Sequence, residues 1–167
     1  MKLICIGDSL TFGYGVRPSQ RWTRLCAQET GWELVNEGIN GDTTGGMLAR
    51  MQGGVLAELR EGGLGADRPY VLLMGGSNDV FYSGSDAAAR ENMGAMIHQL
   101  FSVGVLPMVG IPLPTDAPHA PRAWAAAVDF EAAERTMKEY CAWLKRCLLY
   151  TSPRPRDLRR SRMPSSA

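Results

Sequence analysis

Leu3-Ile4-Cys5-Ile6-Gly7-Asp8-Ser9-Leu10 is the stretch that decides the fold. Its first four residues are apolar, which is typical of a short buried β-strand. A glycine, an acid and a serine follow at once, so the chain turns sharply where the strand ends. A serine on such a turn lies at the carboxyl edge of a sheet, where hydrolases of the α/β class hold their nucleophile. The stretch therefore predicts an α/β fold with a reactive Ser9 at the sheet edge.

Further apolar runs alternate with helix-like segments along the chain. Strands are predicted at residues 32–36, at 70–74 and within 103–111, and helices are predicted to begin near Ser19, at Thr43 or Thr44, at Asp86 and at Asp129. The side chains expected to face the core are Trp22, Leu25 and Cys26; Leu48, Met51, Val55 and Leu59; Ala89, Met93, Met96, Ile97 and Leu100; and Phe130, Ala133, Met137, Tyr140 and Leu144. This order predicts a three-layer α/β/α sandwich with a parallel, flavodoxin-like doubly wound sheet.

Composition narrows the class of protein. A chain of 167 residues with 45% hydrophobic residues is expected to form one globular domain. A net charge of +1 argues against a nucleic-acid-binding surface over the whole protein. The four cysteines have no CxxC spacing, so neither a disulfide framework nor a zinc site is expected. No apolar run approaches the roughly 20 residues of a membrane span, and only four apolar residues follow Met1-Lys2, so a cytoplasmic location is expected.

Polar motifs follow three of the predicted strands. They are Ser9 after the first strand, Asn40-Gly41-Asp42 after the second and Gly76-Ser77-Asn78-Asp79 after the third. Ligands of open α/β sheets bind beyond the carboxyl ends of the strands, so the three motifs are expected at one rim. Ser9 supplies a hydroxyl for attack on an acyl carbonyl, while its N–H, the Gly41 N–H and the Asn78 amide form an oxyanion hole.

These motifs resemble the SGNH hydrolase superfamily, the GDSL-type esterases and lipases. Gly7-Asp8-Ser9-Leu10 matches the first block of that family, Gly41 the second, and Gly76-Ser77-Asn78-Asp79 the third, over residues 1–146. The resemblance implies a serine esterase with Ser9 as nucleophile and Ser9, Gly41 and Asn78 as oxyanion donors, with no cofactor and no metal. It implies small acyl esters as substrates, as for the arylesterase, thioesterase and lysophospholipase members.

The catalytic base of the family is not evident. Its last block, Asp-x-x-His, follows a fifth strand near the carboxyl terminus, but this chain has only two histidines. His98 falls in a predicted helix. Asp116-Ala117-Pro118-His119 has the spacing of the block, but it follows the fourth strand and precedes the last helix. We therefore expect Asp116 and His119 to be a decoy that does not reach Ser9.

Residues 147–167 differ in character from residues 1–146. They carry five arginines and one acid, and residues 147–157 resemble the translation of a transposon-type sequencing adapter. A frameshift and a genuine basic tail that binds anionic partners are the alternatives. A tail of this composition is expected to be extended or poorly ordered, and the sheet is expected to lack its last strand.

Three functions are compatible with these patterns. The first is an acyl-ester hydrolase that is truncated before its base and has little activity as given. The second is a catalytically silent binding module on the same fold. The third is a flavodoxin-like nucleotide binder, which is disfavoured because no phosphate-binding Gly/Ser/Thr loop follows the first strand.

Overall fold

A single parallel sheet organises the molecule. The computed structural model describes residues 1–61, 69–120 and 125–151. Its sheet has the order β2-β1-β3-β4, formed by β1 (Lys2–Gly7), β2 (Glu33–Gly38), β3 (Tyr70–Met74) and β4 (Met108–Val109). Gly7, the last residue of β1, pairs with Gly38 on one side and with Met74 on the other. The carboxyl ends of these three strands therefore lie side by side.

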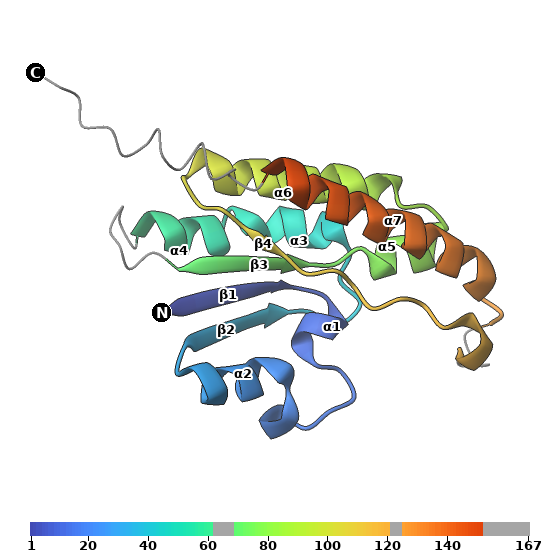
Figure 1. Cartoon of the computed structure of the whole chain (residues 1–167), viewed down its shortest axis with the longest axis horizontal. Coiled ribbons are helices and arrows are strands. Elements are labelled where there is room, and N and C mark those ends of the chain that lie inside the picture. Colours follow the sequence, from blue (N-terminus) through green and yellow to red (C-terminus); the bar gives the residue numbers. More distant parts are fainter. Residues whose placement is uncertain (62–68, 121–124, 152–167) are drawn as a thin grey trace, which may run out of the picture.

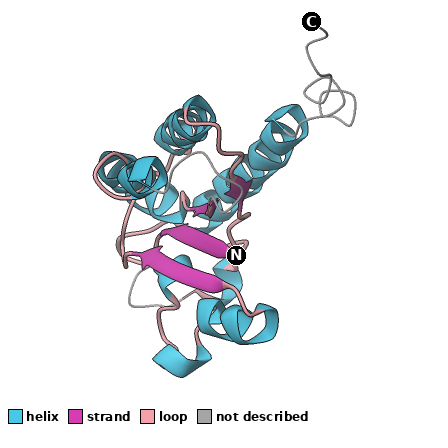
Figure 2. Ribbon diagram, turned by 90° about the vertical axis from the view of Figure 1, so that its left-hand side faces the viewer, coloured by secondary structure: helices cyan, strands magenta, loops and turns pink. Residues whose placement is uncertain are grey.

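Helices cover both faces of the sheet. Figure 1 shows α1 and α2 beneath it and α3, α4, α6 and α7 above it, and Figure 2 shows the same layers after a quarter turn. The helices are α1 (Ser9–Phe12), α2 (Trp22–Thr30), α3 (Thr44–Met51), α4 (Val55–Glu61), α5 (Ser77–Ser83), α6 (Ala87–Ser102) and α7 (Phe130–Thr151), with short 3₁₀ turns η1 (Pro18–Gln20) and η2 (Ala117–His119). The predicted α/β/α sandwich with a parallel sheet is confirmed.

The main core fills the upper face. Ile4 and Ile6 of β1 and Val71 and Leu73 of β3 point into it, as the two-residue period of a strand requires. The apolar stripe predicted for the third helix is confirmed, because all its members are buried in α6: Ala89, Met93, Met96, Ile97 and Leu100. In α7 the predicted members Ala133, Met137, Tyr140 and Leu144 are buried, whereas Phe130 at its start is only partly buried. Every residue of the edge strand β2 remains at least partly exposed.

Three local predictions need correction. The helix expected from Thr43 is two helices, α3 and α4, interrupted at Gly53-Gly54, where glycine weakens helix propagation. Ser19 does not cap α2, because it lies in η1 and α2 begins at Trp22. Leu25 does not face the core either, since it is 48% exposed.

The carboxyl-terminal predictions are met only in part. Within the predicted strand region 103–111, only Met108–Val109 pairs with β3, between Pro107 and Gly110. α7 continues past the expected boundary at residue 146, so residues 147–151 are helical rather than extended. No fifth strand occurs in the described ranges. Residues 152–167, which are the remainder of the predicted tail, lie outside those ranges. No described helix is long and apolar enough to cross a membrane.

Candidate active site

Ser9 is the first residue of a one-turn helix directly after β1. The Asp8 carboxylate caps this helix by accepting a hydrogen bond from the Leu10 N–H at 2.9 Å. Gly7 permits the tight exit from the strand, because a Cβ there would lie 2.1 Å from Thr11 Oγ1 and 2.3 Å from the Met74 carbonyl oxygen. At the first position of a helix the Ser9 N–H has no intrahelical acceptor. The serine thus presents its hydroxyl and its N–H together.

Gly41 lies in the exposed loop between β2 and α3. Its φ of +77° is the left-handed conformation that favours glycine. The loop is fixed to the end of β1, since the Ile39 N–H donates to the Gly7 carbonyl at 3.0 Å, and it turns through a bond from the Asp42 N–H to the Ile39 carbonyl at 3.1 Å. Among the described residues the Gly41 N–H has no hydrogen-bond partner. It is therefore available to a ligand.

Asn78, the second residue of α5, contacts the Gly41 loop directly. Its Nδ2 donates to the Asp42 carbonyl at 2.8 Å. The amide carries two hydrogens, and the described residues provide an acceptor for only one of them. The bond fixes the orientation of the amide and leaves one donor beside the Gly41–Asp42 backbone.

Arg50 of α3 links the first two loops and was not singled out by the sequence. Its Nε and Nη2 each lie 3.0 Å from Asp42 Oδ2, and Nη2 also donates to the Gly7 carbonyl at 3.0 Å. The Arg50 and Asp42 side chains are 23% and 11% exposed. An arginine eight residues after a motif acid was the only signal, and helices carry many such arginines on their solvent faces.

Asp79 connects the third loop to two helices. Its carboxylate accepts hydrogen bonds from the Thr44 N–H at 2.9 Å and the Thr44 hydroxyl at 2.7 Å, and Asn92 donates to that hydroxyl at 3.2 Å. Asp79 is buried, so these bonds compensate for its loss of water. These structural hydrogen bonds account for the presence of Asp79 in the Gly-Ser-Asn-Asp motif.

Asp8 is the electrostatically perturbed group of the site. Burial raises the pKa of its carboxyl; the hydrogen bond from Leu10 acts against this, and the negative charges of Asp42 and Asp79 add to the rise. Its Oδ2 is buried without a partner in the described structure. Asp8 therefore caps α1, but its ionised form is disfavoured by burial in the folded protein.

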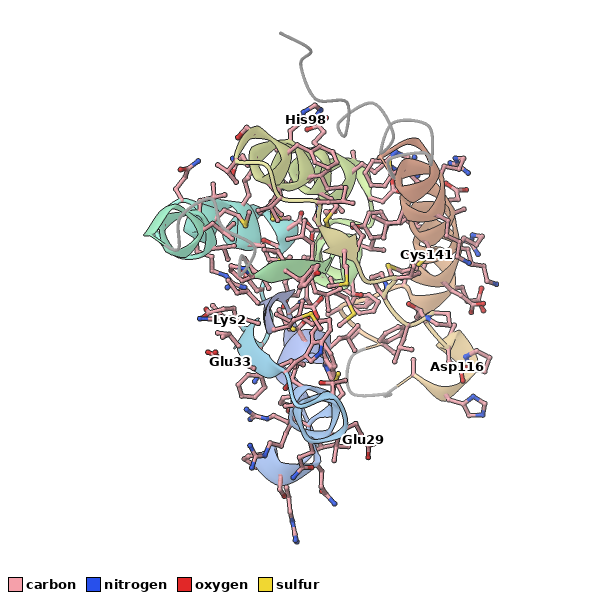
Figure 3. The ribbon with its side chains drawn as sticks, turned by 60° about the vertical axis from the view of Figure 1, so that its left-hand side comes forward. Lys2, Glu29, Glu33, His98, Asp116 and Cys141 are labelled. Atoms are coloured by element: carbon pink, nitrogen blue, oxygen red, sulfur yellow. The ribbon has the colours of Figure 1, made fainter. Side chains whose placement is uncertain are left out.

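Neither histidine contacts Ser9 in the described parts of the chain. His119 Nδ1 lies 2.9–3.0 Å from both carboxylate oxygens of Asp116, and the His119 side chain is 83% exposed. Figure 3 shows Asp116 on a loop at the outer edge of the molecule, and His98 at the far end of the helical layer. The pair forms locally, one turn apart in η2, and the described residues provide no acceptor for the Ser9 hydroxyl.

One hollow of the described structure is separate from these motifs. It has a volume of about 1100 Å³ and lies between η2 and the start of α7, where Ala117, Pro118, Val128 and Phe130 line it. Ser9, Gly41 and Asn78 are not among its lining residues. The described residues contain no group of three or more His, Cys, Asp or Glu side chains that could hold a metal.

Comparison with known proteins finds a matching family and a similar esterase. Residues 5–161 match the GDSL-like Lipase/Acylhydrolase family. Esterase TesA of Pseudomonas aeruginosa is 29% identical over 127 residues, which make up 72% of this chain and 58% of that protein, so the chain spans less than two thirds of its relative.

Solved structures share the fold. A member of the lipolytic protein G-D-S-L family from Veillonella parvula superposes with a TM-score of 0.72 at 20% identity, covering 90% of this chain and 73% of the other. The aryl esterase of M. smegmatis gives a TM-score of 0.67 at 20% identity, with coverages of 89% and 80%.

Proposed function

The chain belongs to the GDSL-like lipase/acylhydrolase family, and we propose that it is a serine ester hydrolase domain in which Ser9 is the nucleophile. In this proposal the Ser9 hydroxyl oxygen attacks the carbonyl carbon of a small acyl ester, and the carbonyl electrons move onto its oxygen. The Ser9 N–H, the Gly41 N–H and the second Asn78 hydrogen stabilise that oxyanion. Donors fixed in advance act strongly, since loss of one typically lowers the rate by roughly 10²–10³.

The bond from Asn78 to the Asp42 carbonyl is the observation that carries this proposal. It joins the third motif to the second at 2.8 Å, although the two residues are 36 positions apart in sequence. The Ile39–Gly7 bond joins the second motif to the first. Donor groups that are held together and left without partners fit a developing negative charge better than a purely structural turn.

We propose that turnover by this chain is nearly absent. The Ser9 hydroxyl needs a base to take its proton. His119 does not fill this role in the proposal, because its exposed side chain is paired with Asp116. Members of a catalytic triad act as a unit, so loss of the base lowers turnover by on the order of 10⁶ and leaves only residual oxyanion-hole catalysis. A silent binding module is the second candidate, and the exposure of His119 favours it.

The DNA downstream of codon 146 separates the two candidates. We expect the gene at its source to continue into an apolar strand and an Asp-x-x-His block. The continued protein is then expressed beside the present chain, each with a Ser9→Ala variant, and assayed with p-nitrophenyl acetate. We expect Ser9-dependent hydrolysis by the longer protein alone. Inactivity of both favours the binding module, whereas rapid Ser9-dependent hydrolysis by the present chain means that a base was missed.

A further inference from the structure

The segment that follows the nucleophile is basic. Between Ser9 and Gln28 the sequence contains Arg17, Arg21 and Arg24 and no acid. Arg21 is used internally, because its guanidinium stacks on the Phe12 ring at 3.9 Å from the centroid. Arg17 and Arg24 are exposed and take part in no ion pair of the described structure. Two positive charges are therefore free to meet an anionic partner.

The same segment exposes large apolar side chains. Tyr14 is 74% exposed, Val16 47% and Leu25 48%. Tyr14 and Val16 lie on the loop that leads to η1, between and beside two glycines with positive φ, and Leu25 follows Arg24 on α2. We call residues 13–25 the basic lobe. Figure 3 shows the segment projecting below the sheet, with nitrogen-tipped side chains pointing away from the body, and Glu29 further along α2.

The basic lobe is firmly attached to the helix that carries Ser9. The Trp22 indole donates to the Leu10 carbonyl at 3.1 Å, and Asn36 of β2 donates to both the Thr11 carbonyl and the Thr23 hydroxyl, at 2.9 and 3.0 Å. A surface that binds the lobe therefore also fixes the orientation of the Ser9 turn. Anything docked there is held next to the proposed catalytic edge.

We propose that the basic lobe docks onto an anionic lipid surface. Exposed arginines beside tyrosine and aliphatic side chains match the boundary between phosphate headgroups and acyl chains, which takes up both kinds of group. The side chains are exposed on a loop and on the first turn of a helix, which favours a broad surface over a small ligand. That docking brings ester-bearing lipids to Ser9 rests on the proposed function, whereas the docking itself does not.

Vesicle binding tests the proposal without any turnover. The chain is sedimented with vesicles of phosphatidylcholine alone and of equal parts phosphatidylcholine and phosphatidylglycerol. Because the five arginines of residues 154–162 also attract anionic lipid, all variants are made in a chain that carries glutamine at those positions. We expect Arg17→Gln with Arg24→Gln to weaken partitioning into the anionic vesicles about fivefold per arginine. Tyr14→Ser with Val16→Ser is expected to weaken partitioning severalfold and to leave Tm nearly unchanged, because both side chains are exposed.

The matched control removes two exposed charges from another element. Arg135→Gln with Lys145→Gln on α7 is expected to leave partitioning unchanged, although the net charge falls equally. Equal loss in the control, equal binding to uncharged vesicles, or no binding by the tail-neutralised chain overturns the proposal. Retention on polyglutamate without vesicle binding also overturns it and assigns the lobe to an acidic polypeptide. Ser9→Ala is expected to bind vesicles normally, so failure of hydrolysis and failure of docking are separate results.

Discussion

Replacement of Arg50 by methionine tests whether the Arg50–Asp42 pair holds the site together. Methionine keeps much of the aliphatic length of arginine but removes its charge and its hydrogen bonds. Asp42 Oδ2 then loses two donors at 3.0 Å, and the Gly7 carbonyl loses one of its two. The Asp42 carboxylate is only 11% exposed, so water replaces these donors poorly.

The expected loss of stability follows from this burial. Removal of one partner of a buried ion pair costs about 3–5 kcal/mol, because the remaining charge is left uncompensated. Since Arg50 keeps 23% of its side chain in solvent, we expect the lower end, about 3 kcal/mol. For a domain of this size each kcal/mol lowers Tm by roughly 2–4 °C, which gives a decrease of about 6–12 °C.

Thermal and urea unfolding measure the change against a matched control. Lys138→Met breaks a pair of the same type with Glu134, but that lysine is 67% exposed, so we expect a much smaller loss of stability. Adding Asp42→Asn to Arg50→Met removes the stranded charge and is expected to recover part of the loss. Two results would refute the reasoning. One is an equally small loss of stability in Arg50→Met and Lys138→Met, and the other is a loss in the Arg50→Met, Asp42→Asn double variant that equals the sum of the two single losses.

Three further changes test other contacts. A Cβ at Gly76 would lie 2.5 Å from the buried ring of Tyr140 at a φ of +111°, whereas Gly84 has a φ of +72° and open space; Gly76→Ala is therefore expected to lose several kcal/mol, and Gly84→Ala only about 1–2, in urea unfolding. Burial raises the pKa of the Cys5 thiol from 9.0 to about 12, so the free energy of unfolding should fall as the pH rises through that window in the wild type, and fall less steeply in Cys5→Ala, where the raised pKa values of Cys141, Cys147 and Tyr140 remain. Burial also raises the pKa of Asp8, so an ionised Asp8 destabilises the fold at neutral pH and this penalty disappears as the pH falls through the raised pKa; Asp8→Asn should be more favourable relative to wild type at neutral than at acid pH, and a pH-independent difference would count against it.

The fold was predictable because its signals are local. Apolar runs marked β1 and β3, and the helical spacing of apolar residues marked α6 and α7 down to their buried members. The errors fell where weak local signals compete: Gly53-Gly54 divides one predicted helix, and prolines and glycine reduce a nine-residue strand region to two paired residues. In those places backbone restrictions outweigh side-chain patterning.

The placement of the three motifs was predictable from the sequence, but the contacts that support them were not. Ser9, Gly41 and Asn78 were expected at neighbouring strand ends, and the structure places them on adjoining turns, while their catalytic roles stay a prediction. Arg50 and the Thr44–Asp79 contact were not foreseen, because side chains that meet across 8 and 35 positions have no fixed spacing in sequence. The cap formed by Asp8 is a local feature of the turn, but the burial that raises the pKa of Asp8 depends on packing that the sequence does not display.

The bond from the Tyr140 hydroxyl to the Gly75 carbonyl bears on the order in which the protein matures during synthesis. Tyr140 is fully buried, and its oxygen lies 3.0 Å from a turn made 65 residues earlier. The ribosome synthesises the three motif-bearing strands first, so their turns emerge before Tyr140 is translated. The Gly75–Gly76 turn, from which Asn78 projects, is therefore secured only after α7 has left the exit tunnel. Chains still held on the ribosome and released chains should therefore differ in protease resistance at this turn.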